Sequence, residues 1–228
     1  EAGIGKTRLI DQVAVEAAAC GGRVLTGRFH ETEQMLPYQG WIDAFRSGEV
    51  LGGLGDPGIW RAELARLFPE LGSPPAAVGK GVRLLEAMFA VVDRLAMRQR
   101  LLLVLDDLHW ADEMSVRLVS FIARRIRQRS VLILGSAREE DLIEARTLRQ
   151  ALEELDRDEL LERLPLSPLS QVHTVELVRT LLRRGTAETA VARVGEEIWQ
   201  TSEGNPFVIV EALREHAEGG RAPGPGPV

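Results

Sequence analysis

A continuous apolar run at residues 101–105 ends directly on two carboxylates, Asp106 and Asp107. Five consecutive apolar residues suit a strand buried on both faces of a parallel sheet, because a surface strand would alternate apolar and polar residues. Acidic residues at the end of such a strand are costly unless they have a task, and open α/β sheets bind ligands at the carboxyl ends of their strands. The run therefore predicts an α/β fold with a site at that edge. The alternative is that Asp106 or Asp107 only caps the next segment.

A glycine-rich segment, Gly3-Ile4-Gly5-Lys6-Thr7, lies at the start of the chain. Gly3 and Gly5 permit backbone angles that turn successive N–H groups around a phosphate, and a helix beginning near Lys6 adds the positive end of its dipole. Lys6 supplies a mobile charge for the terminal phosphates, and Thr7 is placed to bind Mg²⁺. Lys6 and Lys80 are the only lysines among 28 basic residues, so a lysine in this loop is a specific choice. The alternative is a turn that leads into a helix and binds nothing.

Together, the loop and the carboxylates predict a P-loop NTPase. Asp106 would hold Mg²⁺ through water, and Asp107 would orient or deprotonate the attacking water. The opening glycine of the loop pattern would lie before Glu1, so we expect a fragment whose first strand is missing. Arg138 follows a second buried strand at 131–135 and would project from the same edge, towards a terminal phosphate. An ion pair with Glu139, Glu140 or Asp141 is the alternative for Arg138.

Helices and strands alternate over a predicted core at residues 1–166. We expect strands at 23–27, 101–105, 131–135 and 160–164, and helices at 7–19, 82–97, 115–129 and 145–155. Aromatic and aliphatic residues at helical spacing between 37 and 68 are expected to pack in the core. Three helices without an intervening strand, at 170–184, 188–201 and 206–217, predict an all-helical subdomain at 167–218. A Gly/Pro-rich linker or tail follows at 219–228.

Composition narrows the class of protein further. The net charge of −6 argues against a dedicated nucleic-acid surface, and the basic stretch 124–129 is better explained as a solvated helix face balanced by the acidic stretch 153–162 than as a DNA or partner contact. The one cysteine, Cys20, excludes a disulfide framework, indicates a reducing, cytoplasmic location, and is expected to be a small core residue of the first helix. No stretch is long and apolar enough to predict a membrane span, and the four histidines lack metal-ligand spacing.

Four segments carry a resemblance to a known family: 3–9 (Gly-Ile-Gly-Lys-Thr-Arg-Leu), 106–112 (Asp-Asp-Leu-His-Trp-Ala-Asp), 136–138 (Ser-Ala-Arg) and 204–207 (Gly-Asn-Pro-Phe). Together they resemble the STAND class of signalling ATPases, and more narrowly the AAA-type ATPase module of large ATP-dependent LuxR-type transcriptional regulators. The resemblance spans roughly residues 1 to 217. The repeat-rich sensor region and the DNA-binding helix-turn-helix of that family are not in this chain.

The resemblance implies a set of ligands and roles. ATP or ADP would bind with Mg²⁺, and Arg138 would be a sensor arginine that faces the γ-phosphate. The segment 204–206 would bring a helical lid against the nucleotide, with Pro206 near the base. DNA would be bound only through a domain outside this chain, no membrane partner is expected, and self-association is left open. The nucleotide-binding residues implied are Gly3, Ile4, Gly5, Lys6, Thr7, Arg8, Gly204 and Pro206.

Three functional hypotheses follow. The first is a regulatory ATPase switch, in which Mg²⁺-ATP closes the helical lid and slow hydrolysis resets it. The second is an interaction scaffold that binds nucleotide without hydrolysing it. A small-molecule kinase is less favoured, because no acceptor motif is found. His109 and Trp110 are expected to fix the loop after the central strand rather than to carry chemistry.

Overall fold

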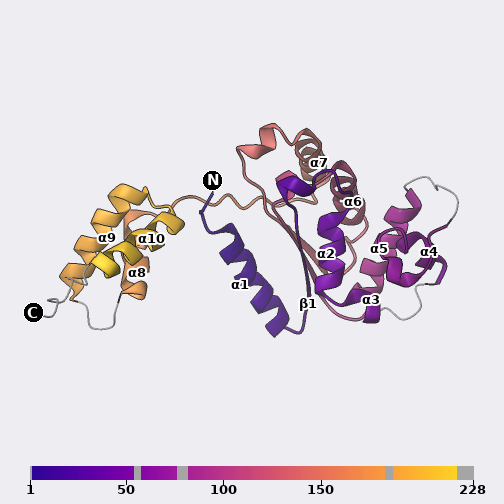
Figure 1. The fold of residues 1–228 in the computed structure, drawn as a ribbon, viewed down its shortest axis with the longest axis horizontal. Coiled ribbons are helices and arrows are strands. Elements are labelled where there is room, and N and C mark those ends of the chain that lie inside the picture. Colours follow the sequence, from indigo (N-terminus) through magenta and orange to yellow (C-terminus); the bar gives the residue numbers. More distant parts are fainter. Residues whose placement is uncertain (1, 54–57, 76–81, 183–186, 220–228) are drawn as a thin grey trace, which may run out of the picture. The chain divides into compact units, whose positions relative to one another are not determined.

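The structure is a computed structural model that describes residues 2–53, 58–75, 82–182 and 187–219. The chain divides into two compact units, Thr7–Arg163 and Glu1–Lys6 with Leu164–Val228. The described elements follow one another along the chain as shown in Figure 1: α1 (Lys6–Ala19), β1 (Arg23–Arg28), η1 (Glu31–Glu33), α2 (Gln39–Ser47), α3 (Val50–Gly53), η2 (Gly58–Trp60), α4 (Arg61–Leu64), η3 (Pro69–Leu71), α5 (Val82–Ala96), β2 (Leu101–Asp106), η4 (Leu108–Trp110), α6 (Glu113–Ala123), β3 (Val131–Gly135), η5 (Asp141–Ile143), α7 (Arg146–Arg157), α8 (Gln171–Leu181), α9 (Glu188–Ser202) and α10 (Pro206–Gly219).

Three parallel strands in the described residues form one sheet in the order β1-β2-β3. Leu101 of β2 lies opposite Arg23 of β1 and Val131 of β3, so the three strands start in register. Every residue of β2 is buried, as its unbroken apolar sequence predicts for the middle strand of a parallel sheet. The predicted α/β fold class is thereby confirmed, and the predicted strands at 23–27, 101–105 and 131–135 are all present.

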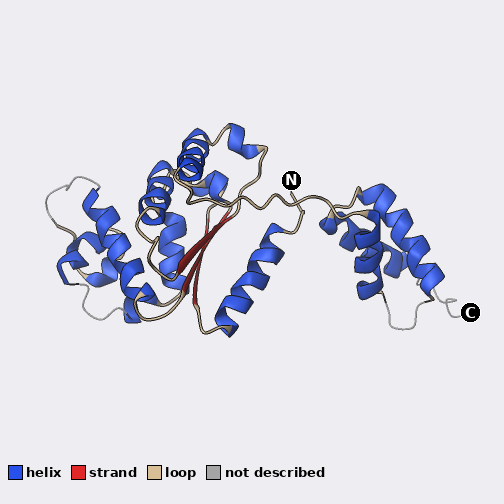
Figure 2. Cartoon of the chain, turned by 180° about the vertical axis from the view of Figure 1, so that it is seen from behind, coloured by secondary structure: helices blue, strands red, loops and turns tan. Residues whose placement is uncertain are grey.

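The two faces of the sheet bury alternate residues of β2. Leu102 and Val104 pack with Ile10 of α1, whereas Leu101, Leu103 and Leu105 belong to the large core formed with α2, α5 and α6. Figure 2 shows α1 on one side of the strands and the other helices of this unit on the opposite side. The face that packs with α1 is covered only in part, because Leu132 of β3, opposite Leu102, is 58% exposed. Polar side chains follow at the carboxyl ends of the strands, where Arg28, Asp106 and Ser136 lie.

The core beneath α2 is aromatic and closely packed. Trp41 and Phe45 are fully buried, and the ring of Phe45 stacks on that of Phe68 with centroids 5.9 Å apart. The prediction that the aromatics between 37 and 68 are core residues is confirmed for these side chains. A Cβ on Gly27 would lie 1.8 Å from the carbonyl oxygen of Gly40, so β1 and α2 approach more closely than any side chain at Gly27 would allow.

Three sequence expectations are wrong. Residues 160–164 form no strand, because Leu160 follows a left-handed residue, Glu159 (φ 55°), that ends α7, and Leu164 is 75% exposed with no strand beside it. Cys20 is not a core residue, because α1 ends at Ala19 and Cys20 lies exposed in the following turn. The helix expected to run to 129 ends at Ala123, so the basic stretch 124–129 is not a helix face.

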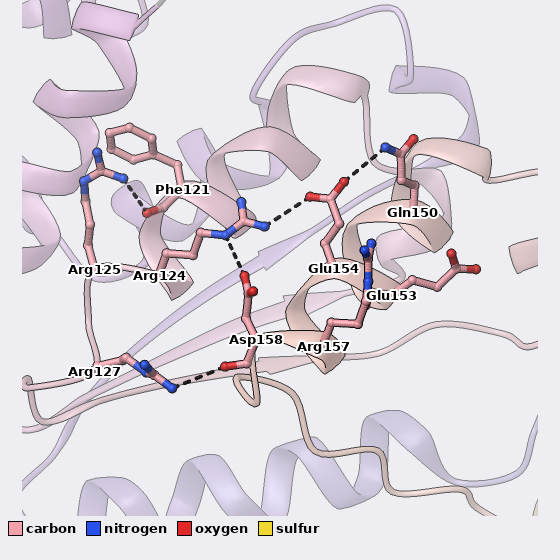
Figure 3. Close-up of polar contacts among 9 residues, drawn as sticks. All are labelled: Phe121, Arg124, Arg125, Arg127, Gln150, Glu153, Glu154, Arg157 and Asp158. Carbon is pink, nitrogen blue, oxygen red and sulfur yellow. Dashed lines mark hydrogen bonds and ion pairs between the residues drawn. The ribbon is translucent and has the colours of Figure 1, made fainter.

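The basic stretch instead folds back onto the end of α7 (Figure 3). Arg124 donates to Glu154 (3.1 Å) and Asp158 (3.0 Å), and Arg127 donates to the carbonyl oxygen of Asp158 (3.2 Å). The pairing with the acidic stretch agrees with the sequence analysis, although the geometry is that of a turn. Surface pairs of this kind contribute little to the free energy of unfolding.

The second unit contains α8, α9 and α10 around a small apolar core. Val178, Val194 and Ile209 are among its buried residues, and Ser170 caps α8 by accepting a hydrogen bond from the His173 N–H. The helices begin and end close to the predicted limits, with residues 183–184 of the first one outside the described part of the chain. Of the predicted tail 219–228, only Gly219 is described, as the last residue of α10. No helix of the described chain has the length and apolarity to cross a membrane.

Candidate active site

Asp106 is the last residue of β2 and lies 3% exposed at the carboxyl edge of the sheet. Its backbone carbonyl accepts from the N–H of Phe29, which continues the pairing of β1 with β2 past the end of β1. The pairing of β2 with β1 therefore holds the Asp106 backbone, and the pairing of Leu105 and Leu108 with Ser136 holds the residues on either side of the two aspartates. A buried carboxylate at this place requires partners, because an unpaired charge inside a protein is very costly.

Ser136 is the first partner of the Asp106 carboxylate. The Ser136 hydroxyl donates to Asp106 Oδ1 (2.5 Å) and accepts from the N–H of Asp107 (3.0 Å). The backbone of Ser136 continues the β2–β3 pairing, since its N–H donates to the carbonyl of Leu105 and its carbonyl accepts from Leu108. Ser136 thus joins the ends of two strands and orients both aspartates at the same time.

Arg28 is the second partner and comes from the other neighbouring strand. As the last residue of β1, it donates to Asp106 Oδ2 from Nε (3.1 Å) and from Nη2 (2.5 Å). The hydrogen bond to Asp106, supported by the charges of Asp106, Asp107 and Asp11, raises the pKa of Arg28 above its ordinary value. Arg28 is therefore a permanent positive charge in contact with the central carboxylate.

Asp107 turns the chain away from the strand. It adopts a left-handed conformation (φ 58°, ψ 45°), which is uncommon for a residue with a side chain and is tolerated best by Asp and Asn. Its side chain forms no cap hydrogen bond with η4, and the cap of α6 is Asp112, which accepts from the N–H groups of Met114 and Ser115. The alternative prediction, in which Asp106 or Asp107 only caps the next segment, is therefore wrong. Strained backbone of this kind is typical of functional sites.

Thr7 and Asp106 line one pocket of about 280 Å³. The lining also includes Arg28 and Asp11, together with Asp43 of α2. A hydroxyl and a carboxylate oxygen are donors that Mg²⁺ prefers, and a small number of protein oxygens completed by water and phosphate is how this ion is usually held. The donor set of Thr7 and Asp106 thus fits the predicted metal.

Arg138 lies in the loop after β3, where its Nε is 3.9 Å from Asp141 Oδ2. The predicted alternative, an ion pair with a nearby acid, is therefore present. His109 is fully buried, with Nε2 3.3 Å from the same Asp141 oxygen and its ring 4.8 Å from that of Trp110. These contacts tie the loop after β2 to the loop that carries Arg138, which agrees with a structural role for His109. The structure brings Arg138 to Asp141, and gives no contact between Arg138 and Asp106.

The glycine-rich loop has the conformation that its sequence predicts. Gly3 (φ 76°) and Gly5 (φ 100°) adopt positive φ angles that favour glycine, Ile4 is buried, and α1 begins at Lys6. Thr7 and Arg8 follow as exposed residues in the first turn of the helix. The N–H groups at the start of α1 are the ones that a phosphate would contact.

The segment 204–207 touches this loop. Asn205 Nδ2 donates to the carbonyl of Ala2 (2.9 Å), and the N–H of Phe207 approaches the carbonyl of Gly3 (3.3 Å) while also donating to Asn205 Oδ1 (3.0 Å). A Cβ on Gly3 would lie 2.8 Å from Asn205 Oδ1. Gly204 (φ 82°) packs against the carbonyl of Leu169, and Pro206 begins α10. Asn205 and Phe207, rather than Gly204 or Pro206, make these polar contacts with the start of the chain.

Sequence reasoning assigned no role to Arg28, Ser136 or Asn205. Arg28 and Ser136 directly follow predicted strands, so their position at carboxyl ends of a parallel sheet was a usable signal. Asn205 was part of the quoted motif, but the partners of its amide come from the other end of the chain. Pairing between such distant segments is not visible in a single sequence.

The comparisons with known proteins agree with this geometry. A family model described as "AAA ATPase domain" matches residues 1–134, which is more than half of the chain. The chain belongs to the AAA ATPase domain family. Domains of this family bind ATP or ADP with Mg²⁺, and the matched region of this AAA ATPase domain contains the glycine-rich loop, Arg28 and the two aspartates. A comparison with curated proteins found none that matches the chain.

Proposed function

We propose that this AAA ATPase domain is an ATP-binding and hydrolysing regulatory switch of a signal-transduction protein of the LuxR-type, STAND class. The observation that carries the proposal is the placement of Asp106, which is buried at the end of the central strand, oriented by Ser136 and Arg28, and shares a pocket with Thr7. A buried carboxylate that neighbouring side chains orient in this way is suited to bind a metal ion, unlike an exposed acidic residue that only keeps the surface soluble.

The residues have distinct roles in this proposal. Gly3, Ile4, Gly5, Lys6 and Thr7 form the phosphate-binding loop, with Arg8 beside it, and Thr7 and Asp106 would hold Mg²⁺, whose chemistry is to bridge and neutralise phosphate oxygens. Asp107 would orient the attacking water. Its backbone N–H donates to the Ser136 hydroxyl and its backbone turns left-handed, which together fix the point from which its side chain leaves the chain.

The switch itself is assigned to the helical unit. Asn205 and Phe207 contact the backbone of Ala2 and Gly3, so a phosphate that orders this loop would also bias the start of α10. Gly204 and Pro206 shape this junction, and Arg138 would exchange Asp141 for a γ-phosphate. We favour a regulatory role over the scaffold because the residues proposed for hydrolysis, Asp107 and Arg138, follow two neighbouring strands, and because the start of α10 contacts Ala2 and Gly3.

A cytoplasmic setting is part of the proposal and is supported by the single cysteine. We assign DNA contact to no surface of this chain, because Arg124 and Arg127 are bonded to the end of α7 and the net charge is −6.

Equilibrium binding of a fluorescent ATP analogue tests the nucleotide site. We expect Lys6→Ala to weaken binding by about 100-fold, because it removes the only full positive charge of the loop. Lys80→Ala is the matched control, since it removes the other lysine of the chain, and it should bind like the wild type. If Lys6→Ala and the wild type bind the ATP analogue with equal affinity, the proposed nucleotide site is wrong.

Turnover measurements distinguish the switch from the scaffold. Asp107→Asn should retain ATP binding and reduce phosphate release by at least about 100-fold, because the amide cannot take a proton from water. A wild-type chain that binds ATP and releases no phosphate would instead favour the non-hydrolysing scaffold.

A further inference from the structure

The Asp106 carboxylate already has a cation on one of its two oxygens. Ser136 occupies Oδ1, and two N–H groups of Arg28 occupy Oδ2. A carboxylate offers about four lone-pair positions, so these three hydrogen bonds leave little capacity for another ligand. A metal ion at Asp106 must therefore share the carboxylate with Arg28 or displace it.

The two partners differ in how readily they can leave. Ser136 is 8% exposed and is anchored by backbone pairing to both Leu105 and Leu108. The Arg28 side chain is 46% exposed, and its guanidinium is joined to the backbone through a flexible stem. Arg28 is thus the partner that can move without breaking the sheet.

The pocket provides a place for Arg28 to go. Asp11 of α1 and Asp43 of α2 line it together with Arg28 and Asp106, so two further carboxylates share the pocket with the guanidinium. The charge of Asp11 already acts on Arg28, and a guanidinium this close to carboxylates does not lose its proton. Movement, and not deprotonation, is the only way for Arg28 to release Asp106.

We propose that Arg28 is a positioning residue that competes for Asp106 Oδ2 with the metal ion, or with the water through which Asp106 would hold it, and so lowers the metal affinity of the site. The inference rests on the proposed function of Asp106 as a metal-binding carboxylate. Arg28 keeps the buried carboxylate neutralised and oriented by β1, and metal binding is coupled to displacement of the guanidinium towards Asp11 and Asp43. The metal affinity of the site therefore depends on β1, a strand that contains neither the glycine-rich loop nor the two aspartates.

Binding of a fluorescent ADP analogue tests this coupling without requiring turnover. Its affinity is measured at saturating Mg²⁺ and again with EDTA, and the ratio of the two affinities reports how strongly the metal is bound. For Arg28→Gln, we expect the ratio to rise about tenfold with the EDTA affinity unchanged within about twofold, because a positive charge beside the metal has been removed. Arg28→Lys retains the charge without the forked geometry and should fall between Arg28→Gln and the wild type.

Arg129→Gln is the matched control. Arg129 is also a partly exposed arginine that pairs with an acid on another element, Asp93 of α5, and it lies before β3, at the opposite end of the strands from Asp106. Its ratio should equal that of the wild type. Thermal unfolding of each variant shows whether it is folded. If Arg28→Gln does not fold, the ratio measured for Arg28→Lys decides the question.

The other outcomes are decisive as well. An unchanged ratio in Arg28→Gln overturns the inference, and a large loss of affinity in EDTA overturns it in favour of a phosphate-binding arginine. Asp106→Asn distinguishes a failure of the metal-binding role of Asp106 from a failure of the competing role of Arg28. If Asp106→Asn has the same ratio as the wild type, the assignment of Asp106 to the metal is wrong. If Asp106→Asn loses the Mg²⁺ effect but Arg28→Gln has the ratio of the wild type, the proposed function stands and only the role of Arg28 is rejected.

Discussion

Ser136 shows how much of the site depends on one small side chain. A serine hydroxyl can donate one hydrogen bond and accept others, and Ser136 uses both capacities, towards Asp106 Oδ1 and from the Asp107 N–H. Its position one residue after β3 places it beside the end of β2 through ordinary strand pairing. The geometry of both aspartates therefore depends on a residue that carries no charge.

Removing the Ser136 hydroxyl should lower activity more than nucleotide affinity. For Ser136→Ala, we expect ATP turnover to fall about tenfold or more, because groups that orient a metal-binding carboxylate typically have effects of this size. Steady-state phosphate release and binding of an ATP analogue are the measurements. Ser115→Ala is the control, since Ser115 is also a buried serine and its hydroxyl has no hydrogen-bond partner in the described structure. Equal turnover in the two variants would contradict the role of Ser136.

The conformation of Asp107 and the partner of Arg28 also depend on the residues around them. The sequence identified Asp107 through its neighbour and its strand, but its left-handed backbone could not be anticipated, because Asp adopts that conformation only when its surroundings require it. Arg28 directly follows a predicted strand, which indicates a place at the carboxyl edge of the sheet but does not say which side chain it contacts. Only the pairing of β1 with β2 places it on Asp106.

At the scale of elements, the contact of β1 with α2 positions one wall of the pocket. Gly27 precedes Arg28 on β1, and Asp43 lies on α2, so the spacing of these two elements sets the distance between the pocket's guanidinium and one of its acids. The spacing is small because Gly27 faces the backbone of Gly40. Asp112 adds a second tie, since it caps α6 through one oxygen and accepts from the Tyr38 N–H through the other.

A methyl group at Gly27 should separate these elements. We expect Gly27→Ala to lower the free energy of unfolding by about 2 kcal/mol or more, because a Cβ placed 1.8 Å from the Gly40 oxygen forces α2 away from the strand. Urea denaturation followed by circular dichroism measures the change. Gly52→Ala has no atom within 4 Å of its new Cβ and lies within α3, so it should be neutral or slightly stabilising. Similar stability of the two variants would rule out close packing as the reason for Gly27.

The limits of sequence-based prediction also lie at this scale. Helix α6 was expected to continue to residue 129 because arginine is a good helix former and no Gly or Pro interrupts the stretch. The helix ends at Ala123 because Arg124 and Arg127 turn towards the end of α7, which is a tertiary contact. The leucines around 160–164 suggested a strand, but a strand needs a neighbour, and the described sheet provides none there.

At the scale of the whole chain, Asn205 connects segments that are far apart in the sequence. Its amide nitrogen donates to Ala2, and its amide oxygen accepts from Phe207 in the first turn of α10. The second contact is the kind that caps a helix, and Pro206 fits the first position of the helix that follows. A change in the glycine-rich loop can therefore reach α10 through the Asn205 side chain, as well as through the longer contact of the Phe207 N–H with the Gly3 carbonyl.

Hydrogen exchange tests this connection. In the wild type, we expect ATP to slow amide exchange at residues 207–213, because ordering the loop also orders the cap of α10. In Asn205→Ala, basal exchange there should be about fivefold faster, as expected from the loss of a cap worth about 1 kcal/mol, and the ATP effect should largely disappear. Ser170→Ala, which removes the cap of α8, is the control, because it should leave the ATP effect at 207–213 intact. An ATP effect that persists in Asn205→Ala would exclude this side chain as the connection.

The sequence by itself determined the class of fold and the type of chemistry. An unbroken apolar run of five residues demands burial on both faces, and two glycines before a lysine and a predicted helix favour a phosphate, so both conclusions rest on local physical requirements. The tertiary structure decided which side chains complete the site. Arg28, Ser136 and Asn205 act through partners 78, 30 and 203 residues away, and hydrogen bonds over such separations exist only after strands and loops have been brought together.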